Sequence, residues 1–112
     1  MTFELTIDES FPLKDDGRYI DIAVSVAAQW SRYNLQYPGK APFELPATIE
    51  FDFYCRNKCT YPYLISASAH RCVVSALVAA KVLPGAGWKS VKGFVDSFSI
   101  DDGSPRAVVR VV

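Results

Sequence analysis

Four segments of the chain have the hydrophobic pattern of β-strands. Apolar and polar residues alternate in two of them, and the clearest case places Ile49, Phe51 and Phe53 on one face. Another, at the end of the chain, is apolar on both faces apart from two arginines, which suits a strand in the centre of a sheet. The four predicted strands are residues 3–7, 48–54, 91–100 and 106–112.

Apolar residues at three- and four-residue spacing predict two helices. The first covers residues 18–34. The second runs from an N-cap at Ser66 to about Val82. The apolar stripe that should face the core is Ile20, Ala23, Ala27 and Trp30 in the first helix, and Ala69, Cys72, Val73, Ala76, Leu77, Ala80 and Leu83 in the second.

Proline and glycine mark the connections between these elements. Residues 36–46 contain three prolines and predict a loop, and residues 84–87 should end the second helix. Residues 101–105, Asp-Asp-Gly-Ser-Pro, predict a hairpin turn between the last two strands. The order β-α-β-α-β-β predicts a single α+β domain, residues 1–112, built as a two-layer sandwich: a mixed sheet of about four strands with two helices on one face.

Composition indicates a small soluble protein. Half of the 112 residues are hydrophobic, which is enough for a core. No apolar run reaches the roughly 18 residues that a membrane span needs, and the first residues lack the pattern of a secretory signal. The number of cysteines is odd, at three. We therefore expect reduced thiols, a cytoplasmic location and no membrane association.

Charge is distributed unevenly although the net charge is zero. Residues 1–52 contain nine acids and four cations, whereas residues 53–95 contain six cations and no acid. Such an acid-free segment could present a basic surface to phosphate or to an acidic protein. Alternatively, its cations are scattered over the domain and pair with the acids of the first segment.

Several short segments resemble the RusA family of Holliday junction resolvases. The element order is similar, and the matching segments fall at the family's first strand, the entry to its first helix, its second strand and its second helix. They are residues 3–7 with Pro12 after them, Gly17-Arg18-Tyr19, residues 45–51, Ser75-Ala76-Leu77 and Val82-Leu83. The resemblance implies a RusA-like fold, a homodimer and an origin among phages and prophages.

The carboxylates that hold Mg²⁺ in the RusA family are missing from this chain. The family has an Asp-x-Asp-Asn motif at the start of its second helix, where this chain has Ile65-Ser66-Ala67-Ser68. Arg71 occupies the position of the family's cation, but the later aspartate falls near residues 86–88, where there is no acid. The nearest acid is Asp96. Because Mg²⁺ requires oxygen ligands, we predict no metal, no cofactor and no enzymatic activity.

Two other arrangements of reactive residues are weak. Cys55 and Cys59, with His70 and Cys72, are suitable ligands for zinc, but on a helix the last two lie about 200° apart, so His70 should face outward. Ser66 precedes His70 by one helical turn, yet no acid is near in sequence to orient the imidazole. The two tryptophans are expected in the core or at a subunit interface.

The candidate binding residues lie in and beside the acid-free segment. Residues 54–63 interleave aromatic residues with cations, a pattern that can stack on bases and hold phosphates, or anchor a protein. We predict a non-catalytic protein that binds branched DNA or another polyanion; the alternative is a protein-interaction module, such as a phage accessory protein acting on a host factor. An active nuclease with displaced acids is least favoured. The predicted binding residues are Arg56, Lys58, Tyr61, Tyr63, Arg71, Lys89 and Lys92.

Overall fold

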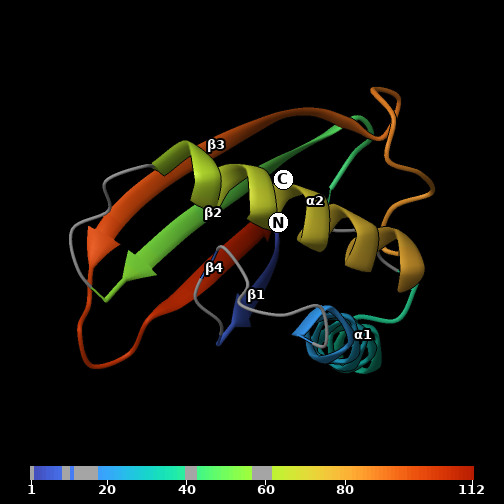
Figure 1. Ribbon diagram of the computed structural model, residues 1–112. Coiled ribbons are helices and arrows are strands. Elements are labelled where there is room, and N and C mark those ends of the chain that lie inside the picture. Colours follow the sequence, from blue (N-terminus) through green and yellow to red (C-terminus); the bar gives the residue numbers. More distant parts are fainter. Residues whose placement is uncertain (1, 9–10, 12–17, 40–42, 57–61) are drawn as a thin grey trace.

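The four strands form one mixed sheet in the order β1-β4-β2-β3 (Figure 1). The computed structural model describes residues 2–8, 11, 18–39, 43–56 and 62–112. β4 is antiparallel to both of its neighbours, whereas β2 and β3 are parallel. The bounds of the strands are β1 Phe3–Ile7, β2 Ala47–Cys55, β3 Val91–Ile100 and β4 Arg106–Val111.

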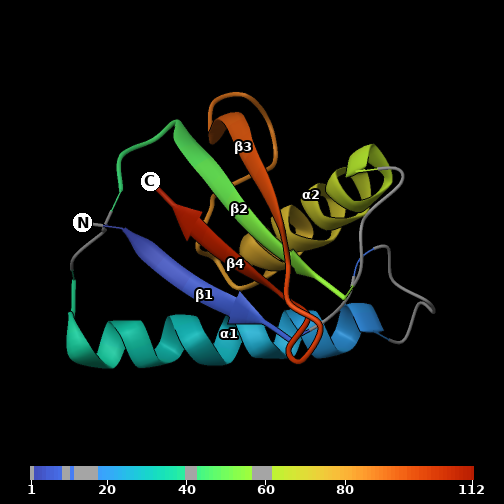
Figure 2. The ribbon, with the colours of Figure 1, turned by 90° about the vertical axis from the view of Figure 1, so that its left-hand side faces the viewer.

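One face of the sheet is buried and the other is open. Alternate residues of β1, β2 and β4 are buried, as the two-residue period predicts. Two helices, α1 (Arg18–Gln36) and α2 (Pro62–Ala79), cover the buried face (Figures 1 and 2). The expected α+β architecture, its element order and its mixed four-stranded sheet are therefore confirmed. The core lies between the sheet and the helices, and its largest fully buried side chains are Phe3, Leu5, Ile7, Ile22, Val26, Ile49, Phe51, Val73, Leu77, Leu83, Val109 and Val111.

The predicted hairpin between the last two strands is wrong, because β2 lies between β3 and β4. The connection instead crosses the end of β2, where the amide of Asp101 donates to the carbonyl oxygen of Cys55 at 2.8 Å. The Asp101 carboxylate then accepts a hydrogen bond from Arg106 at 2.8 Å, and this bond holds the pKa of Asp101 below its usual value. The central position expected for the last strand is confirmed, since β4 pairs on both sides.

The first helix buries a face that coincides only in part with the expected one, since Ala23 and Trp30 pack against the core as predicted. Ile20 is 68% exposed and Ala27 is exposed, whereas Ile22 and Val26 are buried. Trp30 does pack on the core, with its ring centroid 4.8 Å from that of Phe3. The α1 helix has two apolar faces, and the aromatic contact with β1 selects the face that is buried.

The second helix begins and ends earlier than the sequence suggested. It starts at Pro62, a residue favoured at the first helical position, so Ser66 lies inside the helix and is not its cap. It ends at a Schellman motif in which the amide of Val82 donates to Leu77 at 2.9 Å and that of Lys81 to Val78 at 3.0 Å. Lys81 adopts the left-handed φ of 63° that this motif requires, a position usually taken by glycine.

Replacing Lys81 by glycine should stabilise the protein. The left-handed conformation costs a residue with a Cβ about 1 kcal/mol, so Lys81→Gly should raise the free energy of unfolding by up to that amount. Urea denaturation measures the change. Lys81→Ala, which keeps the Cβ, is the matched control; a glycine variant no more stable than the alanine variant would contradict the geometry of this cap.

Candidate functional site

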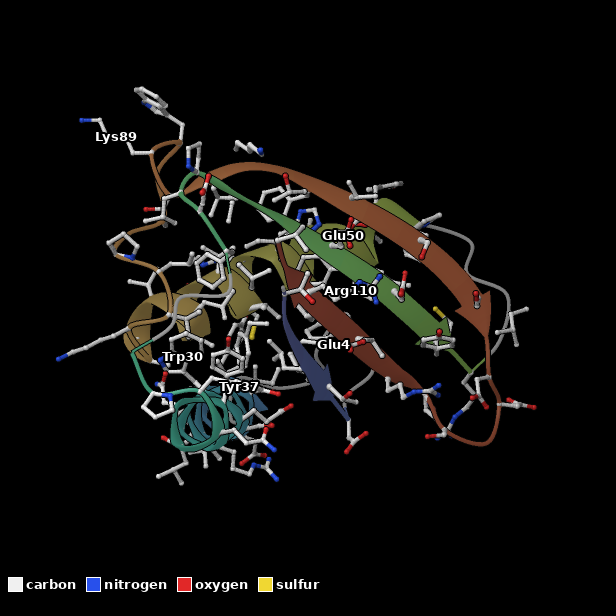
Figure 3. The ribbon with its side chains drawn as sticks, turned by 180° about the vertical axis from the view of Figure 1, so that it is seen from behind. Glu4, Trp30, Tyr37, Glu50, Lys89 and Arg110 are labelled. Carbon is white, nitrogen blue, oxygen red and sulfur yellow. The ribbon has the colours of Figure 1, made fainter. Side chains whose placement is uncertain are left out.

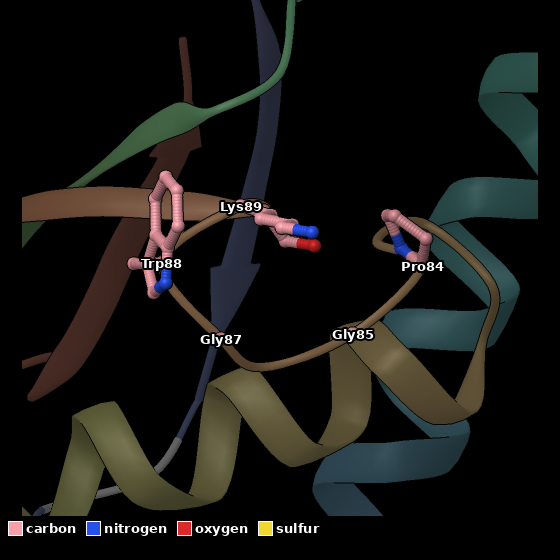
Figure 4. Close-up of a pocket in the computed structure, with 6 residues that line it drawn as sticks. Pro84, Gly85, Gly87, Trp88 and Lys89 are labelled. Carbon is pink, nitrogen blue, oxygen red and sulfur yellow. The ribbon is translucent and has the colours of Figure 1, made fainter.

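Trp88 is the most exposed aromatic side chain of the described residues, at 77%. It lies in the loop of residues 80–90 between α2 and β3, which we call the Trp88 loop. The Trp88 ring and the Lys89 side chain stand beside a hollow of about 440 Å³, with Pro84 across from them (Figure 4). The hollow is lined by Pro84, Gly85, Gly87, Trp88, Lys89 and Ser90.

Both ends of the Trp88 loop are fixed to the fold. At its start, Val82 and Leu83 are buried in the core directly after the Schellman motif. At its end, Ser90 is buried, its amide donates to Gly87 at 2.9 Å, and its carbonyl oxygen accepts from the amide of Ala47 at 2.8 Å. Because the backbone on either side is held, the exposed Trp88 and Lys89 are presented from a fixed position.

The lysines around this loop are not neutralised by the acids that the structure describes. Lys81 precedes the hollow in sequence and Lys89 lines it. Lys92 lies at the β-bulge at the start of β3. Among the described residues none of the three has an ion pair. Within the described residues, these three cations therefore have no partner among the N-terminal acids, of which Glu9, Asp15 and Asp16 lie outside those residues.

Three of the acids in residues 1–52 pair with Arg110, on the open face of the sheet (Figure 3). The Arg110 guanidinium lies 2.6 Å from the carboxylate of Asp52, 3.1 Å from that of Glu50 and 3.6 Å from that of Glu4. The pKa of Asp52 is held below its usual value, mainly by the hydrogen bond from Ser97 and next by the hydrogen bond from Arg110. The bonds to Asp52 and Glu50 raise the pKa of Arg110.

The predicted binding residues that the structure describes do not form one patch. Arg56 follows the last residue of β2, and Tyr63, 65% exposed, lies in the first turn of α2. Lys89 and Lys92 lie at the other end of β2 and β3, about 30 Å away over nine strand residues. Arg71 is exposed in the middle of α2. Lys58 and Tyr61, like Cys59, Pro12 and Gly17, lie outside the described residues.

A carboxylate that is distant in sequence orients the imidazole of His70, contrary to expectation. Asp96, from β3, lies 2.9 Å from Nε2 of His70, and the ring of Phe94 stacks on the imidazole with centroids 4.0 Å apart. His70 therefore faces β3 and does not face outward as expected. Cys72 is buried in the core, as expected of a small apolar residue. Within the described ranges, no group of three or more His, Cys, Asp or Glu side chains could hold a metal ion.

Trp88 is not among the predicted binding residues, although its position in the sequence is a usable signal. Trp88 stands between Gly87 and Lys89 in a glycine-containing segment with no hydrophobic periodicity, and a large aromatic residue there has no neighbours with which to form a stripe. Its exposure rules out the core position that was one of the two expectations. Trp30, which packs on the core, meets that expectation.

Comparisons with other proteins supply no family for the chain. No model of a known protein family matches the chain, and no curated protein matches it with significant similarity. None of the helices in the described ranges is long and apolar enough to cross a lipid bilayer.

Replacing Asp52 by asparagine should reduce stability at neutral pH and remove part of its acid dependence. The pKa of Asp52 is lowered in the folded state, so its contribution is present above the unfolded pKa of about 4 and is lost as the pH falls through the folded value. The side chains of Asp52 and Arg110 are about 30% exposed, so solvent screens their interaction. We therefore expect the free energy of unfolding to fall by only about 1 kcal/mol at pH 7.

Urea denaturation of the wild type and Asp52→Asn between neutral and acidic pH measures this difference. The two stability curves should converge as the pH falls. Asp102→Asn, at an exposed acid with no ion pair among the described residues, is the control and should leave the curve unchanged. A constant gap between the wild type and Asp52→Asn at every pH would contradict the assignment.

Proposed function

We propose that this protein is a non-catalytic binding protein that contacts nucleic acid, or another polyanion, through the Trp88 loop. The observation that carries the proposal is an indole 77% exposed beside lysines without ion pairs in the described structure. Aromatic side chains stack on bases whatever the sequence, while nearby cations hold the phosphates. Both kinds of group are offered here from one anchored loop.

The chemistry of this loop favours nucleic acid with unpaired or unstacked bases. Trp88 can stack only on a base whose face is accessible, and in a continuous duplex those faces are covered by neighbouring base pairs. Single strands and the branch points of DNA junctions expose such faces. Branched or single-stranded DNA is therefore the expected ligand, and uninterrupted duplex should bind only through the weaker contacts of the lysines.

The proposal of a binding role without catalysis rests on the second helix. Ile65 is buried in the core and Ala67 is exposed on α2, at the two positions that match the metal-binding aspartates of the RusA family. The order of elements agrees with the RusA-like scaffold proposed from the sequence. On such a scaffold this chain would keep a nucleic-acid surface and lack the carboxylates for Mg²⁺.

A protein-interaction module is the second candidate, and a separate observation favours it. Phe94, Phe98 and Ile100 are all partly exposed on one face of β3, between 37% and 63%. Exposed apolar clusters of this kind mark contacts between proteins, and this surface has few charges. An accessory protein that modulates a host factor would use it, and would not need the Trp88 loop.

Fluorescence of Trp88 tests the proposed function directly. In a Trp30→Phe background, Trp88 is the only tryptophan, so a base that stacks on it should quench the emission. We expect quenching by a single-stranded oligonucleotide and by a four-way junction, and little by a linear duplex. Binding should weaken as the salt concentration rises, because bound phosphates release counterions.

Matched variants separate stacking from charge. Loss of a stacked base costs about 1–3 kcal/mol, so Trp88→Ala should weaken binding roughly 5- to 150-fold in a gel-shift titration. Lys89→Ala should reduce the salt dependence by about one phosphate contact. Tyr63→Ala, at the other end of the sheet, is the control for an exposed aromatic residue. Absence of quenching and of a gel shift at low salt would remove the nucleic-acid proposal.

A further inference from the structure

The hollow beside Trp88 has the size and the lining of a site for one small ligand. Its volume of about 440 Å³ lies within the range of roughly 300–1,000 Å³ that is typical of small-molecule pockets. All of its lining residues belong to the stretch 84–90, so one short loop forms it. The lining offers one aromatic side chain, Trp88, one cation, Lys89, and no acid. This set matches a ligand with one flat ring system and one anionic group.

Two glycines keep the hollow open. Gly85 and Gly87 both line it, and neither has the left-handed φ that would require a glycine. A Cβ on Gly87 would meet no atom within 4 Å, and a Cβ on Gly85 would lie 3.8 Å from the hydroxyl oxygen of Ser90, an ordinary contact distance. The backbone would therefore accept a side chain at either position, and the effect of the glycines is to leave room for a ligand.

The charge in the hollow favours a phosphate group. Figure 4 shows the Lys89 side chain extending into the space between Trp88 and Pro84. Lys89 is exposed and has no ion pair among the described residues, so an anion can approach it without displacing an acid. A phosphate monoester carries about 1.5 to 2 negative charges at pH 7, more than most other biological anions of its size.

We propose that the hollow binds one purine nucleotide, with its base stacked on Trp88 and its phosphate at Lys89. The inference rests on the proposed function and deepens it, since a single nucleotide is sufficient to fill the site. Purine and indole are both pairs of fused rings, so a purine covers more of Trp88 than a pyrimidine does. Differences in stacking strength of this kind produce base preferences without hydrogen bonds to the base.

The Trp88 loop is held in place before any ligand binds. Leu83 and Ser90, on either side of the hollow, are buried, and the carbonyl oxygen of Ser90 accepts from the amide of Ala47 at 2.8 Å. A site that is already formed spares the entropy of ordering a loop, which would otherwise exceed what one stacked base and one phosphate contribute. A free mononucleotide and an unstacked purine in a strand present the same chemistry to this site.

Titration followed by nuclear magnetic resonance tests the inference on the wild-type protein. The chain has two tryptophans, so the indole N–H of Trp30, packed on the core, is an internal control for that of Trp88. The ligands are dAMP, dCMP, deoxyadenosine and a single strand of deoxyadenylates. We expect dAMP to shift the Trp88 signal alone, and to bind several-fold more tightly than dCMP, which has a smaller base, or deoxyadenosine, which has no phosphate.

A substitution that fills the hollow gives a second test. Gly85→Val should weaken the binding of dAMP at least tenfold. Gly103→Val is the matched control, because a Cβ there also lies 3.8 Å from a side-chain oxygen, that of Asp101, at the far end of β3. Circular dichroism should show that both variants remain folded. Lys89→Ala leaves the shape of the loop unchanged and should remove the preference for dAMP over deoxyadenosine.

The outcomes separate this inference from the proposed function. A single strand that shifts the Trp88 signal when dAMP does not would overturn the one-nucleotide site and leave nucleic-acid binding in place. Equal binding of dAMP, dCMP and deoxyadenosine would also overturn it, as would a folded Gly85→Val variant that binds dAMP normally. If the single strand fails as well as dAMP, the proposed function is lost too. If dAMP binds, its affinity relative to the strand identifies which of the two sources the site prefers.

Discussion

The position of β4 between β1 and β2 is the constraint on which the other features of this fold depend. Arg110 of β4 lies directly across from Glu4 on one neighbour and from Glu50 on the other, and reaches Asp52 as well. An arginine on an outer strand could reach the acids of only one neighbour. The buried face of the same strand contributes Ala107, Val109 and Val111 to the middle of the core, so both faces of β4 favour a central place.

Once β4 is central, β3 can only be an outer strand, reached from β2 through α2. This parallel crossover generates the surface for which we propose a function. Its loop carries Trp88 and Lys89, held by the buried residues on either side, and its strand has one edge without a partner in the described structure. The other outer strand, β1, has its edge covered by Gln29 of α1.

Local periodicity was enough to predict the strands and the architecture, because one buried face imposes a strict alternation on β1 and β2. It could not decide which strands pair. The Asp-Asp-Gly-Ser-Pro segment is typical of a hairpin, yet the Asp101 amide bonds to Cys55 and the chain continues past β2. Nor could it orient α1, since Ile20 and Val24 form a second apolar stripe opposite Ile22 and Val26.

The candidate site was less predictable than the fold, because it depends on distances between segments far apart in the sequence. Arg56 and Lys89 belong to one acid-free segment, but a whole strand separates them in space. The part of that segment around Lys89 and Lys92 includes Trp88, the most exposed aromatic side chain of the described residues. The pairing of His70 with Asp96 was hidden for the same reason, since 26 residues separate them. Binding roles for all seven predicted residues stay predictions, and Lys58 and Tyr61 lie outside the described residues.

Strand order is the central claim, and nuclear Overhauser effects between backbone protons measure it most directly. The account predicts contacts from Val109 to both Leu5 and Phe51, its partners in β1 and β2. Contacts between Ile100 and Arg106, as in a hairpin of β3 with β4, would contradict it: β3 would then have a partner on the edge described as free, and Arg110 would lose its place between two acidic strands.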